Sequence, residues 1–211
     1  MGFKKIVVLF LVLATGLTAF SFRQKKILII GDSISMGYTP YVRKYFLGNI
    51  FIEHNFENAQ HTMNGLKKID QWLGNTRWDI IQFNFGLWDI SHNLPIKYPN
   101  SRVSCSVEQY TANLDSIVSH IKRKSNAKLV YVTTTYVPPK DARRREEEVI
   151  MYNEAAKKVM EKRAVMVNDI YEQSKIIHNN LGKGVSDVHY TTLGYEKLSK
   201  FIIDFLEIEL K

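Results

Sequence analysis

Short apolar runs alternate with helical patterns along most of the chain, and this alternation constrains the fold more than any other feature. The clearest runs have the apolar density of strands that are buried on both faces. Five runs are found, at residues 27–30, 51–56, 78–85, 128–134 and 165–167. Strands that alternate with helices form parallel sheets with right-handed crossovers. We therefore expect an α/β fold, a three-layer α/β/α sandwich around a five-stranded parallel sheet of flavodoxin-like order 2-1-3-4-5.

Apolar residues at helical spacing fill the segments between these strands. The pattern is clearest at residues 107–121, where Ser106 and Gln109 fit a capping box before a regular apolar stripe. Further helices are expected at residues 41–47, 65–73, 144–162, 170–179 and 192–210. With 211 residues, 45% hydrophobic and 24% charged, the chain suits one globular domain.

The first 21 residues differ from the rest of the chain. Lys4 and Lys5 precede an apolar run at residues 6–14, and small residues follow at 18–21. This pattern is typical of a secretory signal peptide and is short for a membrane span. We therefore expect a signal peptide at residues 1–21 and a secreted or periplasmic domain at residues 22–211, with no stable membrane insertion after cleavage. Phe20 makes the cleavage site less clean, so an uncleaved N-terminal anchor stays open as the alternative.

The chain is basic, with a formal charge of +8 that falls to +6 when the two lysines of the signal segment are removed. The basic residues are scattered or mixed with acids, as at residues 143–148, which is typical of a solvated surface. We expect no nucleic-acid partner. Cys105 is the only cysteine, so no disulfide can form within the chain.

A serine follows the first strand at a sharp turn. The apolar run at residues 27–30 ends at Gly31, which permits a tight exit, and Ser33 comes two residues later. Ser33 is therefore expected just past the carboxyl end of a strand, where open α/β sheets bind their ligands. Small polar residues after a strand also form ordinary turns, so this feature alone is weak evidence of a site.

Polar residues also follow the third strand. In the order 2-1-3-4-5, the carboxyl ends of strands one and three flank the switch point of the sheet, so Ser33 and residues 84–89 should converge. Residues 87–104 then form a long loop without periodicity. Long loops in compact domains are usually functional or mobile.

A serine nucleophile needs a base, and the chain offers six histidines. His189 lies in a loop directly before the final helix, with the carboxylate of Asp187 two residues away. A nearby acid can hold the imidazole tautomer and stabilise its cation during proton transfer. His120 and His178 fall in helical patterns, and we interpret both as surface or rim residues.

Three short motifs occur in the order known from one enzyme family. They lie at residues 31–35, 86–89 and 187–189, the last followed by Gly194 and Tyr195. On these motifs, residues 26–205 resemble the SGNH (GDSL) hydrolase family. The resemblance implies that Ser33 is the nucleophile and His189 the base, and that an ester is hydrolysed through an acyl-enzyme with no metal or organic cofactor. Asp32 lies beside the nucleophile, and we expect it among the oxyanion- or substrate-binding residues.

The middle motif departs from the family pattern, because Trp88 stands where the family commonly has an asparagine. An indole offers one N–H donor, whereas an amide offers two and is far smaller. Asn84 is a candidate for the missing oxyanion donor, since strand alternation puts it on the same side as Gly86. The backbone N–H of Gly65 is another candidate, although a glycine that eases entry into a helix explains this residue equally well. The Ser33 N–H is expected to be a further donor.

The last motif departs as well. The family usually has an aspartate three residues before the histidine, and here that position is Ser186. Asp187, two residues before His189, is therefore the expected orienting acid, by a different path of the loop.

Two functional classes follow from these motifs. The first is a serine esterase that removes acetyl or another short acyl group from a carbohydrate; the export signal and the aromatic residues Trp88 and Tyr98 suit a sugar substrate. The second, motivated by Trp88 and Ser186, is a catalytically weak or degenerate protein that binds a glycan or acyl ligand. An acyltransferase would use the same triad. The expected partner is a small-molecule or polysaccharide ester, and the oligomeric state is left open.

Overall fold

The computed structural model describes residues 23–211, which form one parallel sheet covered by helices on both faces. The strand order is β2-β1-β3-β4-β5, and the prediction from the alternation of strands and helices is confirmed. The strands are β1 (Lys25–Ile30), β2 (Ile50–His54), β3 (Ile80–Phe83), β4 (Lys128–Val132) and β5 (Met166–Asn168). The predicted signal peptide lies outside the described residues.

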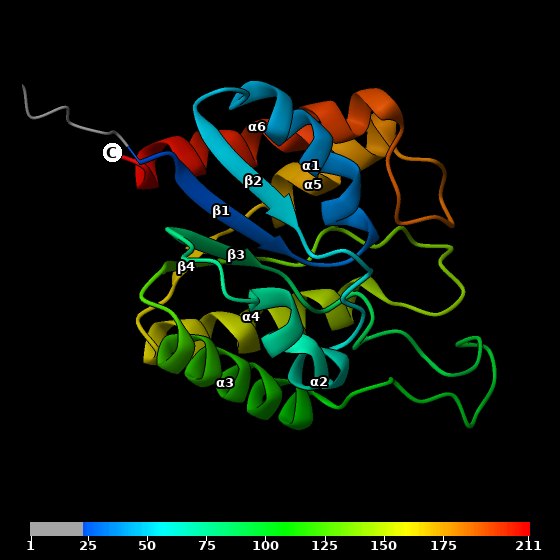
Figure 1. Ribbon diagram of the computed structural model, residues 1–211. Coiled ribbons are helices and arrows are strands. Elements are labelled where there is room, and N and C mark those ends of the chain that lie inside the picture. Colours follow the sequence, from blue (N-terminus) through cyan, green and yellow to red (C-terminus); the bar gives the residue numbers. More distant parts are fainter. Residues whose placement is uncertain (1–22) are drawn as a thin grey trace, which may run out of the picture.

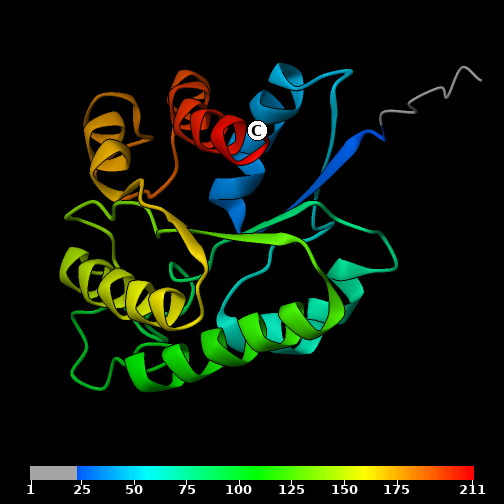
Figure 2. The same cartoon turned by 90° about the vertical axis from the view of Figure 1, so that its left-hand side faces the viewer.

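Two layers of helices cover the sheet. Helices α1, α5 and α6 lie on one face, and α2, α3 and α4 lie on the other (Figures 1 and 2). Their bounds are α1 (Ser33–Tyr45), α2 (Thr62–Leu73), α3 (Val107–Lys124), α4 (Glu146–Lys162), α5 (Tyr171–Leu181) and α6 (Thr192–Glu209). Within residues 23–211, no helix has both the length and the apolar content that a membrane span requires.

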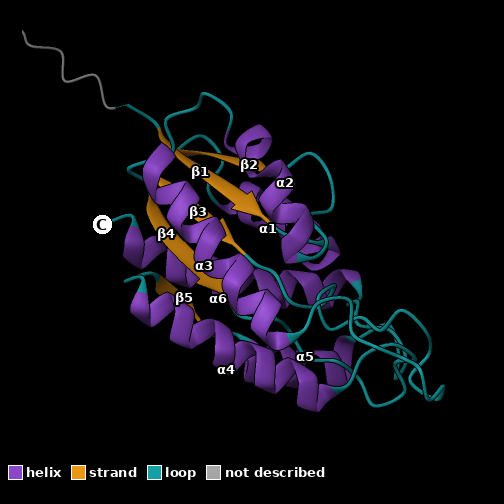
Figure 3. Cartoon of the chain, turned by 90° about the horizontal axis from the view of Figure 1, so that it is seen from below, coloured by secondary structure: helices purple, strands orange, loops and turns teal. Residues whose placement is uncertain are grey.

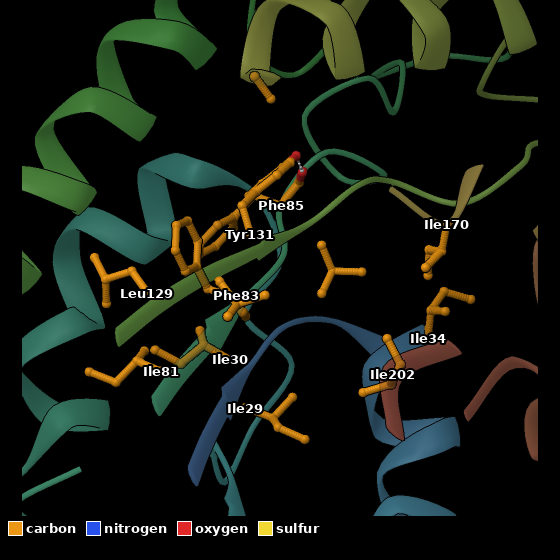
Figure 4. Close-up of a cluster of buried hydrophobic side chains, with 14 of the residues drawn as sticks. Ile29, Ile30, Ile34, Ile81, Phe83, Phe85, Leu129, Tyr131, Ile170 and Ile202 are labelled. Atoms are coloured by element: carbon orange, nitrogen blue, oxygen red, sulfur yellow. Dashed lines mark hydrogen bonds between the residues drawn. The ribbon is translucent and has the colours of Figure 1, made fainter. Parts of the chain in front are cut away.

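The core lies on both faces of the central strands. Residues Ile27, Leu28, Ile29 and Ile30 of β1 are each at most 1% exposed, as expected for an inner strand of a parallel sheet. On one face Ile29 lies near Ile34 of α1 and Ile202 of α6, and on the other Phe83 packs near Tyr131 (Figure 4). This burial fixes the position of the β1 end from which the Ser33 turn departs.

The sheet reverses its direction of growth at β1. Ile30 pairs with Phe83 of β3 on one side, and Ile29 pairs with His54 of β2 on the other. The chain therefore leaves β1 for one neighbour and later returns to the other, which opens a crevice at the carboxyl ends of β1 and β3. Figures 1 and 3 show the long loops gathered on this side of the molecule.

The differences from the predicted bounds that matter for the site are those of α1 and β3. Helix α1 begins at Ser33, whereas the sequence pattern indicated a helix only at residues 41–47. Small polar residues, Gly37 and Pro40 weaken the apolar period of its first turns, but the cap from Asp32 starts the helix directly after β1. Strand β3 ends at Phe83, two residues earlier than predicted, so Asn84 and the following turn lie beyond the sheet.

Candidate active site

Ser33 is the first residue of α1, at the carboxyl end of β1. Asp32 caps the helix, because its Oδ1 accepts a hydrogen bond from the Ile34 N–H at 2.9 Å. The N–H of Ser33 itself has no partner among the described residues. Such free N–H groups carry the positive end of the helix dipole. Ser33 therefore combines a hydroxyl and an anion-binding donor at one point.

His189 and Asp187 complete a continuous hydrogen-bonded chain with Ser33. The Oγ of Ser33 lies 2.9 Å from Nε2 of His189, and Nδ1 of His189 lies 2.6 Å from Oδ1 of Asp187. A carboxylate only accepts, so Nδ1 carries the proton, and Nε2 of the neutral ring is free to accept from the serine. These contacts join residues 156 positions apart in the sequence. The arrangement can deprotonate a serine as it attacks a carbonyl carbon.

The pKa values of the two carboxyl groups near Ser33 shift in opposite directions. Partial burial of Asp187 acts to raise its pKa, but the hydrogen bonds from the backbone and ring of His189 outweigh this and hold the pKa below its usual value. Burial raises the pKa of Asp32, which is 2% exposed, against the opposing effects of the Ile34 N–H and the charges of Arg144 and His189. The hydrogen bonds from His189 therefore favour the ionised form of Asp187 beside the base.

The turn after β3 is anchored by hydroxyl groups. The carbonyl oxygen of Phe85 accepts from Tyr110 at 2.9 Å, and from Tyr131 and Thr134 at 3.0 Å each. Gly86 has a φ of 151°, and a Cβ there would lie 1.9 Å from Oγ1 of Thr134. Only glycine fits this position. The hydroxyl contacts to Phe85 and the close approach to Thr134 therefore fix the backbone path of residues 86–89 toward the crevice.

Asp89 ties this turn to the start of α2. Its Oδ1 accepts from the N–H and hydroxyl of Thr62 at 2.9 and 2.6 Å, and its side chain is fully buried. Burial raises the pKa of Asp89 to about 7, although the hydrogen bonds from Thr62 act in the opposite direction. The aspartate of the 86–89 motif is thus a structural group under the site.

A model of the GDSL-like lipase/acylhydrolase family matches residues 29–197, which include Ser33, the turn after β3 and His189. The chain belongs to this family. It is an SGNH hydrolase, and the acylhydrolase activity of the family accords with the serine, histidine and aspartate found at its crevice.

Solved structures share the fold of this GDSL-like hydrolase at low sequence identity. A lipase/acylhydrolase from Enterococcus faecalis matches with a TM-score of 0.73 and 19% identity, over 88% of this chain and 97% of that chain. The acetyl xylan esterase AlAXEase matches with a TM-score of 0.71 and 11% identity, over 86% and 99%. The acetylxylan esterase Axe2 from Geobacillus stearothermophilus matches with a TM-score of 0.67 and 16% identity, over 85% and 93%. No curated protein matches the chain in sequence.

Gly65 does not offer the free N–H that the sequence analysis considered. The residue lies inside α2, and its N–H donates to the carbonyl oxygen of His61 at 3.2 Å. A Cβ at this position would lie 2.7 Å from Cζ of Phe85 and 3.0 Å from Cδ1 of Ile117. Gly65 is therefore a close-packing position that lets α2 approach the core, and not an oxyanion donor.

The side chain of Asn84 donates a hydrogen bond to another strand. Its Nδ2 donates to the carbonyl oxygen of Val132 at 2.8 Å, which joins the end of β3 to β4. Its side chain lines a small cavity together with Ser35, Tyr38 and Thr133. Strand alternation does not relate Asn84 to Gly86, because β3 ends at Phe83 and both residues lie beyond it. The structure thus gives Asn84 a role under α1 and does not bring it into contact with the triad.

Trp88 keeps a free donor. The side chain is half-buried against the core, and its indole N–H has no hydrogen-bond partner within residues 23–211. Trp88 stands in the anchored turn between Gly86 and Asp89, at the place where the family commonly has asparagine. Of the side-chain donors proposed for the oxyanion from the sequence, the indole N–H of Trp88 and the second N–H of the Asn84 amide have no partner among residues 23–211.

Two further residues at the site carry no local sequence signal. Gln60 has a left-handed φ of 56°, unusual for a residue with a side chain, and the N–H of Ala59 before it donates to the carbonyl oxygen of Gly31 at 2.9 Å. This contact places a strained backbone position beside the Ser33 turn, where such strain is commonly functional.

Arg144 is the second such residue. Its Nε donates to the carbonyl oxygen of Leu87 at 2.7 Å, and its Nη1 lies 3.4 Å from a carboxylate oxygen of Asp141. Only 16% of its side chain is exposed. In the sequence Arg144 is one of several basic residues in a charged run, and only the fold separates it from them. No cluster of potential metal ligands is present in the described part of the chain.

Proposed function

We propose that this GDSL-like hydrolase is a serine esterase that removes acetyl or another short acyl group from a carbohydrate, through an acyl-enzyme. The observation that carries the proposal is the unbroken chain from Ser33 Oγ through both ring nitrogens of His189 to Asp187 Oδ1, with contacts of 2.9 and 2.6 Å. No other group is needed to activate the serine for attack on an ester carbonyl.

In the first half of the reaction, Ser33 Oγ attacks the carbonyl carbon while His189 Nε2 accepts the hydroxyl proton. Asp187 stabilises the resulting imidazolium. The tetrahedral oxyanion is stabilised by the N–H of Ser33 at the start of α1 and by the indole N–H of Trp88. Collapse of this intermediate breaks the ester bond, and His189 returns its proton to the leaving alcohol.

In the second half, a water molecule takes the place of the alcohol. His189 removes a proton from this water as the water attacks the acyl-serine, and the second tetrahedral intermediate collapses to release the acid and restore Ser33. An acyltransferase would differ only at this step, with a sugar hydroxyl in place of water.

The carbohydrate substrate is supported by aromatic residues in the segment that follows β3. Tyr98 is 48% exposed on the loop that follows the turn after β3, and Trp88 is half-buried within that turn. Exposed aromatic rings suit the apolar faces of sugars. Two of the structurally similar proteins named above are acetyl xylan esterases. Export is supported by the basic and apolar composition of residues 1–21, which is typical of a signal peptide.

The experiment compares wild type and Ser33→Ala on acetylated xylan and on 4-nitrophenyl esters of increasing chain length. We expect release of acetate and a preference for the shortest esters, both abolished in Ser33→Ala. A fluorophosphonate should label wild type at Ser33 and should not label the variant. Binding of acetylated xylan without any release of acetate would support the binding protein instead, and acetyl transfer to an added sugar faster than hydrolysis would support the transferase.

A further inference from the structure

His178 lies directly under the loop that carries Asp187 and His189. Its Nε2 is 2.7 Å from the main-chain carbonyl oxygen of Asp187. A carbonyl oxygen can only accept, so Nε2 of His178 carries a hydrogen and donates it. The side chain is 5% exposed, which corrects the interpretation of His178 as a surface or rim residue.

The ring of His178 is held in one position. Tyr136 packs against it edge-on at a centroid distance of 5.5 Å, and Tyr190 does so at 5.3 Å. Gly182 also lies against the ring, because a Cβ there would lie 2.5 Å from Cε1 and 2.6 Å from Nδ1. A ring packed in this way presents its Nε2–H in a fixed direction.

Few other contacts hold the backbone of Asp187 in place. Its own N–H donates to the carbonyl oxygen of Gly184 at a long 3.3 Å, and its side chain is 43% exposed. It lies only two residues before His189, so its carboxylate must turn back along the chain to reach Nδ1. The short hydrogen bond from His178 fixes the carbonyl group of Asp187 and thereby the backbone that carries this carboxylate.

We propose that His178 is a positioning residue of the triad: it holds the peptide carbonyl of Asp187 so that the acid reaches His189 across the shortened spacing. The role rests on the proposed function, since it acts on the Ser33 hydrolysis through Asp187. It also accounts for the departure of this chain from the family pattern, because an acid moved one residue along the loop requires a different support.

The test measures kcat and KM for a 4-nitrophenyl ester in His178→Phe and His178→Gln. Phenylalanine keeps the ring between the two tyrosines and removes the donor, whereas the glutamine amide can place an N–H near the position of Nε2. We expect His178→Phe to lower kcat by about 10- to 100-fold with KM little changed, as for a misplaced catalytic group, and His178→Gln to recover most of the loss. His120→Phe removes a histidine that bonds Asp70 away from the site, at 2.8 Å, and should keep the wild-type rate.

Two readouts separate positioning from a merely structural role. The acidic midpoint of the pH–rate profile should move to lower pH in His178→Phe, because a displaced Asp187 stabilises the His189 cation less. The double variant His178→Phe/Asp187→Asn should be no slower than Asp187→Asn alone, because both changes act on one interaction. If His178→Phe does not fold, His178→Asn takes its place, since its shorter amide cannot reach the carbonyl.

The proposal is overturned if His178→Phe keeps the wild-type kcat and pH midpoint, or if its loss simply adds to that of Asp187→Asn. Equal losses in the glutamine and phenylalanine variants with a lowered melting temperature would also overturn it, in favour of packing alone. Failure of the proposed function is seen separately, as ester hydrolysis by wild type that persists in Ser33→Ala.

Discussion

Oδ1 of Asp187 accepts two hydrogen bonds from a single residue, one from the backbone N–H of His189 at 2.9 Å and one from its ring Nδ1 at 2.6 Å. The first contact closes a tight turn, and the second fixes the tautomer of the ring. Residues 187–189 of the loop therefore contain both the base and the acid that orients it. An acid one position earlier would have to reach the ring by another path, and Ser186, which stands there, is exposed.

Asp187→Asn should lower kcat by about 10³- to 10⁴-fold, which follows the serine-protease precedent for an amide in place of the orienting acid. The amide keeps the size of the side chain but offers an N–H to one side and a weaker acceptor to the other. Steady-state kinetics on a 4-nitrophenyl ester measure the loss. Ser186→Ala is the matched control and should keep the wild-type rate; if it is the slower of the two variants, Asp187 is not the orienting acid.

Trp88→Phe should reduce kcat by about 10²- to 10³-fold, because it keeps the aromatic surface and removes an indole N–H that has no other partner. KM should change little, since the donor acts on the oxyanion that forms during the reaction. Both constants are measured on the same short ester. An unchanged kcat with a raised KM would show that Trp88 binds substrate and leaves the oxyanion to backbone donors.

Asn84→Ala should act on stability instead of rate. The change removes the 2.8 Å hydrogen bond to Val132 and leaves that carbonyl without its donor, which typically costs about 1–3 kcal/mol of unfolding free energy. Urea denaturation measures the loss, and kcat per folded molecule should stay within a few-fold of wild type. A large fall in kcat at unchanged stability would show that Asn84 is an oxyanion donor.

Asp89→Asn should remove a pH dependence of stability. Burial raises the pKa of Asp89 to about 7 in the folded protein, so the folded state binds this proton more tightly than the unfolded chain does. The contribution is therefore complete below about pH 4 and is lost as the pH rises to about 7, with a slope of up to about 1.4 kcal/mol per pH unit. The asparagine oxygen can still accept from Thr62 but does not ionise.

Urea denaturation of wild type and Asp89→Asn at several pH values between 4 and 8 measures this difference. The variant should gain stability relative to wild type as the pH rises. Asp115→Asn is the control, because the hydrogen bond from Arg163 lowers the pKa of Asp115 and confines its effect to more acidic solutions. Parallel pH curves for wild type and Asp89→Asn would show that Asp89 is ionised throughout.

Gly65→Ala should destabilise the fold by about 1–3 kcal/mol, because the new methyl group meets Phe85 and Ile117 in a packed core. The catalytic rate per folded molecule should not change, since the N–H of this residue is already bonded within α2. Leu66→Ala, at an exposed position of the same helix, should cost less. Thermal unfolding and steady-state kinetics measure both effects, and a stable Gly65→Ala variant with a lowered kcat would contradict the packing role.

The sequence by itself determined the layers of the fold. Apolar runs such as residues 27–30 have the pattern of strands buried on both faces, and helical stripes such as residues 107–121 can cover those faces, so their alternation predicts a parallel sheet between two layers of helices. The turn at Ser33 and the pair Asp187 and His189 were also found from the sequence, because each is a local pattern at a predicted element boundary.

The tertiary structure alone decided which polar groups at the site keep a free hydrogen-bond donor and which donate to another residue. Asn84 and His178 donate to carbonyl groups on other segments of the fold, and Gly65 packs against Phe85 and Ile117, and no local pattern records those contacts. A hydrogen bond between distant residues depends on where strands end and how loops pack, and β3 ends only two residues before the sequence pattern would have it. Periodicity reports which side of an element is buried, whereas the direction of a single N–H is set by the packing of the whole chain around it.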